Sequence, residues 1–214
     1  MTPKFSKAVD PIFLHVLGLL DRIARDEDPA AEEERARIRG WFSQAEQTLG
    51  QGDDWLLAKY ALVAWIDDLL IDAPWDGREW WKENALEVEI FNTRSRYEQF
   101  YLKAKEASLL SGKDALEVFY VCVVLGFRGL YRDPATAAGL AEPRGLPPNL
   151  QTWAKHTSMA IRLGQGRPPI SEVSRPIEGA PPLEGPFSLI WSVFLGLVLT
   201  VFIVIFVWLF PVTF

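Results

Sequence analysis

Cysteine and histidine are scarce in this sequence: its 214 residues include one cysteine, Cys122, and two histidines, His15 and His156. A single cysteine excludes a disulfide within the chain and fits a reducing compartment. Both histidines stand alone, without the neighbouring ligands of a zinc site. The sequence also lacks a phosphate loop, a dinucleotide loop and a nucleophile elbow. It therefore predicts no enzyme, no catalytic residues, no cofactor and no metal.

Charge is absent from the last stretch of the chain, Phe187–Phe214, in which about twenty residues are strongly apolar. A helix rises about 1.5 Å per residue, and the apolar core of a bilayer is roughly 30 Å thick. We therefore expect a transmembrane helix over residues 187–210, followed by a short tail, 211–214.

All charges lie before that stretch: 22 basic and 28 acidic residues, with a net charge of −6. This balance indicates neither a nucleic-acid partner nor an anionic lipid surface. The apolar run Ile12–Leu20 is too interrupted for a secretory signal and lacks a cleavage site. We expect the body to stay in the cytosol and the tail to be inserted afterwards.

The body, residues 1–163, is predicted to be all-α. Apolar spacing and breaker residues place helices at 11–25, from 28, and at 53–72, 79–91, 94–108, 114–127 and 150–163. The helix at 53–72 is apolar on most faces, which is typical of a central buried helix. Asp133-Pro134 is expected to end the preceding helix. Residues 164–186 contain six prolines and four glycines and are interpreted as a linker.

The helix at 53–72 ends in three acidic residues, Asp67, Asp68 and Asp72. The helix dipole disfavours anions there, so cations should offset them, and Arg128 and Arg132 are candidates. Three interpretations stay open: a structural ion-pair cluster, a partner-docking site, and a catalytic or metal-binding pair. Adjacent helical residues point about 100° apart, which predicts that one of Asp67 and Asp68 is structural and the other exposed.

Two further groups of residues suggest contacts. Pro74-Trp75-Asp76-Gly77 has the chemistry of a turn, and the Trp75 ring should anchor this turn to the body, although tryptophan is also common at interface hot spots. In the apolar tail, Ser192, Gly196 and Thr200 recur at i, i+4 spacing, which permits close helix approach in lipid. That stripe is either a helix–helix interface or incidental.

Two segments resemble one known family. Ala61–Leu70, which contains Asp67-Asp68, is followed by Pro74-Trp75, as in a family helix that ends Asp-Glu before a Thr-Pro-Trp turn. Leu116–Arg132 resembles the signature LE-x-x-Y-x-C-x-x-LGF-x-G-x-YR. Both belong to the DotU/IcmH family of TssL-like inner-membrane components of type VI or type IVB secretion systems. Asp68 stands where the family usually has Glu, and Ser95–Tyr101 differs from its Gly-Gly-Glu segment.

The resemblance implies an all-α cytoplasmic domain of two small three-helix bundles on one membrane helix, in the bacterial inner membrane. It implies a structural scaffold that links the membrane complex to the cytoplasmic baseplate. The expected partners are an IcmF/TssM-like membrane protein, through it a TssJ-like lipoprotein, and a TssK-like baseplate protein, with self-association besides. The candidate partner-binding residues are Asp67, Asp68, Asp72, Trp75, Arg128, Tyr131 and Arg132.

A second hypothesis remains open on the sequence alone. A helical body on a C-terminal anchor also suits a stand-alone tail-anchored adaptor or receptor that recruits cytosolic proteins to a membrane.

Overall fold

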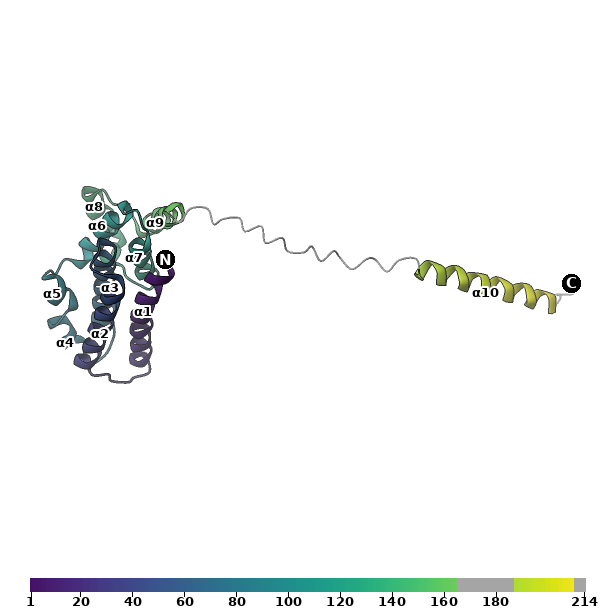
Figure 1. The fold of residues 1–214 in the computed structure, drawn as a ribbon, viewed down its shortest axis with the longest axis horizontal. Coiled ribbons are helices and arrows are strands. Elements are labelled where there is room, and N and C mark those ends of the chain that lie inside the picture. The colour runs from purple at the N-terminus through teal and green to yellow at the C-terminus, as the bar shows by residue number, and fades with distance from the viewer. Residues whose placement is uncertain (165–186, 210–214) are drawn as a thin grey trace. The chain divides into compact units, whose positions relative to one another are not determined.

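The structure, a computed structural model, describes the backbone of residues 1–164 and 187–209 and the side chains of 1–164 and 191–205. The chain divides into two units, Met1–Arg167 and Pro168–Phe214. The helices of the first unit are α1 Pro3–Ala24, α2 Ala31–Leu49, α3 Asp53–Asp72, α4 Arg78–Glu83, α5 Leu86–Phe91, α6 Arg96–Leu109, α7 Asp114–Val124, η1 Gly129–Tyr131, α8 Pro134–Ala141, η2 Glu142–Arg144 and α9 Leu150–Gly164. The second unit contains α10, Phe187–Leu209 (Figure 1). No strand occurs in the residues described, so the all-α prediction is confirmed for them.

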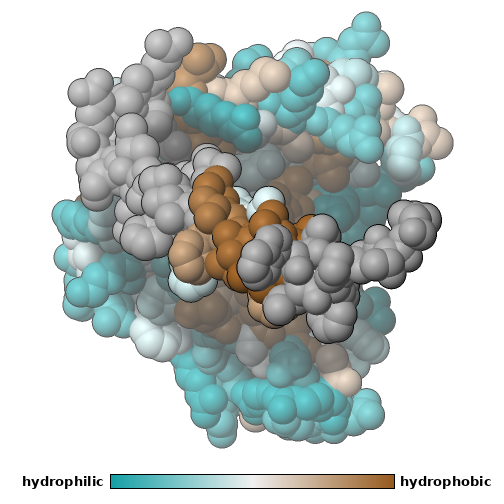
Figure 2. Space-filling model, turned by 90° about the vertical axis from the view of Figure 1, so that its right-hand side faces the viewer, coloured by the Kyte–Doolittle hydropathy of each residue, from teal (hydrophilic) through white to brown (hydrophobic). Residues whose placement is uncertain are grey.

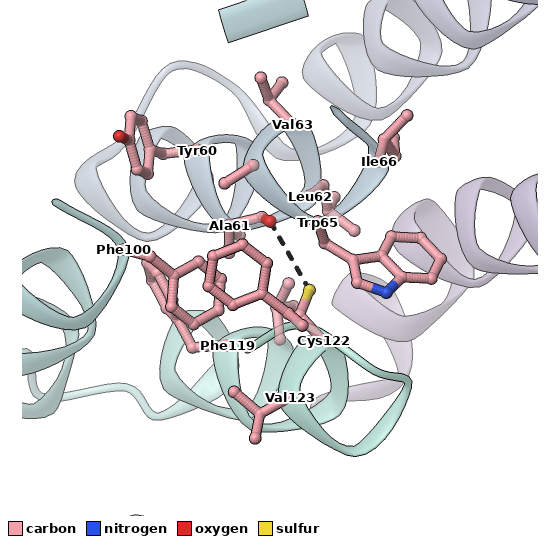
Figure 3. Packing of buried hydrophobic residues seen from close by; sticks show 14 of the residues in the cluster. Tyr60, Ala61, Leu62, Val63, Trp65, Ile66, Phe100, Phe119, Cys122 and Val123 are labelled. Carbon is pink, nitrogen blue, oxygen red and sulfur yellow. Dashed lines mark hydrogen bonds between the residues drawn. The ribbon is translucent and has the colours of Figure 1, made fainter. Parts of the chain in front are cut away.

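The central element of the first unit is α3, which packs against α4, α5, α6 and α7. Its apolar residues are buried on nearly all sides, as the continuous apolar run predicted. On the α7 side the small residue Ala61 faces Cys122, whose thiol lies 3.7 Å from the Ala61 carbonyl oxygen (Figure 3). Full burial raises the pKa of the Cys122 thiol well above its usual range. This cysteine is therefore an inert packing residue.

Aromatic rings fill the space between α3, α6 and α7. Phe100 stacks on Phe127 at a centroid distance of 3.9 Å and meets Phe119 edge-on at 4.9 Å. Contacts group all of Met1–Arg167 into one compact unit. The two small bundles that the family resemblance implied are thus not separate compact units here.

The first helix begins earlier than expected, at Pro3 instead of Pro11, so that Pro11 lies inside α1. Phe5 and Val9 are buried and extend the apolar stripe of the helix toward its N-terminus. Proline removes one backbone hydrogen bond and clashes with the preceding turn, but burial of this stripe outweighs that cost. Thr2 further holds the start of α1, because its backbone N–H donates to Asp114 of α7 at 2.7 Å.

Two other boundary predictions were wrong. The expected helix over 79–91 is two short helices, α4 and α5, separated at Asn84 and Ala85. Asp133-Pro134 does not merely end a helix but starts α8: the Asp133 carboxylate accepts the N–H of Ala135 at 3.0 Å, and Pro134 occupies the first turn.

The turn after α3 is anchored as predicted. The indole N–H of Trp75 donates to the carbonyl of Leu70 at 2.8 Å, and its ring lies 6.2 Å from that of Trp81. A Cβ atom at Gly77 would clash with the Trp75 ring, so the turn requires glycine at this position.

The second unit contains the 23-residue helix α10, which has no charged residue. Its described residues form the brown, hydrophobic group at the front of Figure 2. Its extent agrees with the predicted range 187–210 to within one residue. A search of the described residues for a helix long and apolar enough to cross a membrane found none. The crossing itself stays a prediction. Most of the expected linker, 164–186, and the tail, 211–214, lie outside the described residues.

Candidate functional site

Asp67 lies in the last third of α3 and is completely buried. Its carboxylate accepts three N–H groups: the indole of Trp81 at 2.9 Å, and the backbone of Leu86 at 3.0 Å and of Glu87 at 2.8 Å. The last two belong to the first turn of α5, whose N-cap residue, Ala85, provides no side-chain acceptor. A carboxylate from α3 thus performs the capping that the local sequence of α5 does not supply.

Burial raises the pKa of Asp67 even though the three N–H donors oppose this shift. No arginine forms a salt bridge with it in the part of the chain described, so the expected pairing with Arg128 or Arg132 was wrong for this residue. The adjacent backbone and indole dipoles provide the compensation instead.

Asp68 has the cationic partner that the sequence predicted. Its Oδ1 lies 2.8 Å from Nη2 of Arg132, and Nη1 of the same guanidinium pairs with Asp72. Asp68 is buried, whereas the side chains of Arg132 and Asp72 are 44% and 48% exposed. Burial raises the pKa of Asp68, and the positive charge of Arg132 opposes that rise. Arg132 therefore joins a buried carboxylate to an exposed one.

The prediction that one of the two adjacent aspartates would be exposed was wrong, because Asp67 and Asp68 are both buried. Their side chains do diverge, one toward α4 and α5 and the other toward Arg132. Since elements cover α3 on several sides, both directions lead into the body.

Arg128 and Tyr131 have structural positions. The Arg128 guanidinium donates to the carbonyls of Val123 at 3.0 Å and Phe127 at 3.1 Å, near the end of α7. A cation there satisfies free carbonyls and the helix dipole. The expected ion pair between Arg128 and the α3 aspartates is absent from the salt bridges of the described residues. The Tyr131 hydroxyl donates to the carbonyl of Pro147 at 2.6 Å.

Sequence reasoning missed Glu87, the most connected carboxylate of this region. It is fully buried, and its Oε1 accepts the Tyr60 hydroxyl at 3.1 Å, the Thr93 hydroxyl at 2.8 Å and the Ser95 N–H at 3.0 Å. Arg96 approaches its Oε2 at 3.7 Å. The sequence feature that could have revealed Glu87 is a glutamate directly after the apolar Leu86, with the hydrogen-bonding residues Thr93 and Ser95 close by in the chain.

The part of this region that reaches the surface is small. Arg132 and Asp72 are half-exposed, and Tyr97 beside them is 38% exposed, with the Arg132 guanidinium 5.8 Å from its ring centre. We name Asp72, Tyr97 and Arg132 the polar edge. In the described residues, no group of His, Cys, Asp or Glu is placed to hold a metal ion. The arrangement can fix helices to one another and present this edge to a partner.

The described residues thus form an all-helical body whose buried carboxylates connect its helices, and this fold defines the class to which the chain is compared. Residues 4–209 match the family described as "Type VI secretion system protein DotU". The chain therefore belongs to the DotU family of type VI secretion system proteins, and the resemblance carried by Ala61–Leu70 and Leu116–Arg132 is confirmed.

A solved structure supports the fold. The chain is similar to the "Cytoplasmic domain of TssL from Acinetobacter baumannii", with a TM-score of 0.58 and 22% identity, over 75% of this chain and 98% of that one. A comparison with curated proteins gave no match.

Proposed function

We propose that this protein is a membrane-anchored structural subunit of the inner-membrane complex of a type VI secretion system, and that it connects this complex to the cytoplasmic baseplate. The observation that carries the proposal is the extent of the family match. It covers residues 4–209 and so includes both the helical body and the charge-free helix α10.

The helical body is suited to a scaffold. Its buried carboxylates are used within the fold: Asp67 caps α5, Asp68 pairs with Arg132, and Glu87 holds Thr93 and Ser95. Groups engaged in this way stabilise a rigid surface and perform no chemistry. The protein acts as a structural component and not as an enzyme.

The anchor in this proposal is α10. Its described side chains are apolar and exposed, for example Trp191 at 65% and Phe202 at 72%. Large exposed apolar surfaces require a covering, and a bilayer supplies it for a helix without charge. The protein would then be a single-pass protein of the bacterial inner membrane with its body in the cytoplasm.

The partners in this proposal are an IcmF/TssM-like membrane protein, a TssJ-like lipoprotein reached through it, and a TssK-like baseplate protein. For the baseplate partner the polar edge is the candidate contact, because Asp72, Tyr97 and Arg132 combine both charges with an aromatic ring. Trp75 and Tyr131, the other two candidate contact residues, are both largely buried.

Affinity purification of the tagged full chain from its own bacterium, in mild detergent, tests the proposal. We expect the IcmF/TssM-like and TssK-like proteins among the recovered partners. Asp72→Lys should reduce recovery of the baseplate protein, whereas Glu33→Lys, which reverses an acid 70% exposed on α2, should not. Recovery of cytosolic proteins unrelated to secretion would favour the tail-anchored adaptor and overturn the scaffold role.

A further inference from the structure

The last helix of the body, α9, differs in charge from the rest of the chain. No acidic residue occurs between Glu142 and Glu172, although the chain as a whole has a net charge of −6. Within this interval α9 carries Lys155, Arg162 and His156. A basic segment in an acidic protein creates a local positive potential that the net charge conceals.

The outward side of α9 combines these cations with apolar side chains. Lys155, Met159, Arg162 and Leu163 follow the spacing i, i+4, i+7 and i+8, which places them on one face. All four are exposed, Met159 at 48% and Leu163 at 83%. We name these four residues the basic face of α9.

The opposite side of α9 is the one that holds the helix on the body. It buries Trp153, Thr157 and Ile161, and α9 packs against α7. The basic face is therefore not needed for the packing of α9, and its two large apolar side chains remain in water.

The cations of this face have no acidic partner among the residues that the structure describes. Neither Lys155 nor Arg162 makes any of the ion pairs or side-chain hydrogen bonds found in the described residues, whereas cations elsewhere, such as Arg22 and Arg35, pair with glutamates. Unpaired exposed cations keep their full charge for an external anion.

The positive surface continues from α9 onto α6. A hollow of about 260 Å³ between these helices is lined by Lys105 and His156 over a floor that includes Tyr101, Leu146 and Trp153. Lys105 also lacks an ion pair within the described residues. At the far end of α9, the stem of Lys113 lies against Gly164. Asp114 and Glu117 line a hollow with Lys113 at that end, so the positive surface extends from the basic face toward Lys105 only.

We propose that the basic face of α9, together with Lys105, binds the surface of an anionic phospholipid bilayer. Lysine and arginine attract acidic headgroups, and leucine and methionine among them can enter the interface region. An acidic protein segment would use the cations but would leave Leu163 and Met159 without an apolar environment. The inference rests on the proposed membrane anchoring, since α9 is the last helix of the body before the chain reaches α10.

This contact would also orient the body. An acidic protein near an anionic membrane is repelled overall, so a single acid-free face selects which side turns toward the lipid. The net charge of the chain gave no indication of binding to an anionic lipid surface. It averages over the whole chain and therefore conceals a basic face formed by one helix.

Site-specific fluorescence on the full chain in lipid nanodiscs tests the proposal. Cys122 is buried, so a cysteine introduced by Met159→Cys can be labelled selectively with a small apolar fluorophore. Leu14→Cys on α1, where the leucine is 69% exposed, provides the control site. The discs contain either neutral phosphatidylcholine alone or a mixture with phosphatidylglycerol, and both carry a lipid-borne quencher.

The expected result is strong quenching at position 159 in the anionic discs, weak quenching there in neutral discs, and none at position 14 in either. Adding Lys155→Gln and Arg162→Gln should weaken the lipid contact on the order of tenfold. Arg25→Gln with Arg94→Gln, which removes the same charge elsewhere, should leave it unchanged.

Three results would overturn the proposal. Equal quenching at position 159 in neutral and anionic discs would exclude headgroup recognition. Absence of quenching together with loss of a copurifying acidic protein in the Lys155→Gln, Arg162→Gln variant would assign the face to that protein. Failure of the chain to remain in discs of either composition would refute the membrane anchoring, and this inference with it.

Discussion

The indole N–H of Trp81 donates to Oδ1 of Asp67 at 2.9 Å, and both side chains are completely buried. This contact connects α4 to α3, and the same carboxylate holds the first turn of α5. The acidic end of α3 was predicted as a candidate partner-binding surface. Part of it instead holds α4 and α5 to α3 inside the body.

Asp67→Asn should destabilise the body by about 2–4 kcal/mol. An amide offers one oxygen to three N–H donors and turns its own N–H₂ toward one of them. Trp81→Phe, which removes a single donor and keeps most of the ring volume, should cost less, about 1 kcal/mol. Urea unfolding of the body, residues 1–163, measures both. Equal stabilities of the wild type and Asp67→Asn would show that the capping is energetically unimportant.

Arg132→Met should destabilise the body by about 3 kcal/mol, because it leaves Asp68 buried without its cation. Asp72→Asn removes the exposed partner of the same guanidinium and should cost about 0.5 kcal/mol. Thermal unfolding of both variants checks this ratio. Similar losses of stability in the two variants would mean that the buried Arg132–Asp68 contact is no stronger than the exposed Arg132–Asp72 contact.

Asp68 should give the body an unusual pH dependence. Its pKa is raised above the ordinary value of 3.8, so the folded state holds this proton more tightly than the unfolded state. Its contribution to the free energy of unfolding therefore falls as pH rises from 3.8 through the raised pKa. The stability of the wild type minus that of Asp68→Asn should decrease over this interval in denaturant titrations. An increase would mean that Arg132 has lowered the pKa instead.

Residues 1–165 should fold without the rest of the chain. Among the side chains that the structure describes, the buried apolar core runs from Phe5 to Ile161 and includes none of the second unit. We expect a soluble domain with a helical circular-dichroism spectrum and a cooperative thermal transition. A spectrum dominated by strand or coil would contradict this.

Gly196→Leu should weaken association through α10 and leave membrane insertion intact. A Cβ atom at Gly196 would meet nothing within 4 Å, so the isolated helix tolerates the change and only a partner helix would sense it. Ser192 and Thr200 lie on the same side, one turn before and after. Val198→Leu, on the opposite side, is the matched control. Crosslinking in membranes measures the association. Unchanged crosslinking of Gly196→Leu would show that Gly196 is not part of a helix–helix interface.

The sequence predicted best where a single local pattern decides the structure. The bounds of α3 were predicted correctly because Gly52 precedes it, Pro74 follows it and apolar residues fill it. The same reasoning missed α8, since Asp133-Pro134 can end one helix or start the next. The Asp133 side chain settles this by capping Ala135.

The candidate site was less predictable because its contacts join distant segments. The break between α4 and α5 depends on Asp67, which lies 19 residues before Leu86. Of the two guanidinium groups in one motif, only that of Arg132 pairs with the aspartates, and that of Arg128 turns back onto α7. Such choices depend on how η1 turns after α7, and helical periodicity carries no information about that.

The capping of α5 by Asp67 has a consequence for motion. A helix of six residues is too short to persist by itself. Its first amides are held by a residue of the most buried helix of the body, so α5 can open only when that carboxylate releases it. Hydrogen exchange at Leu86 and Glu87 should then be as slow as in the interior of α3, and the two helices would open as one cooperative unit.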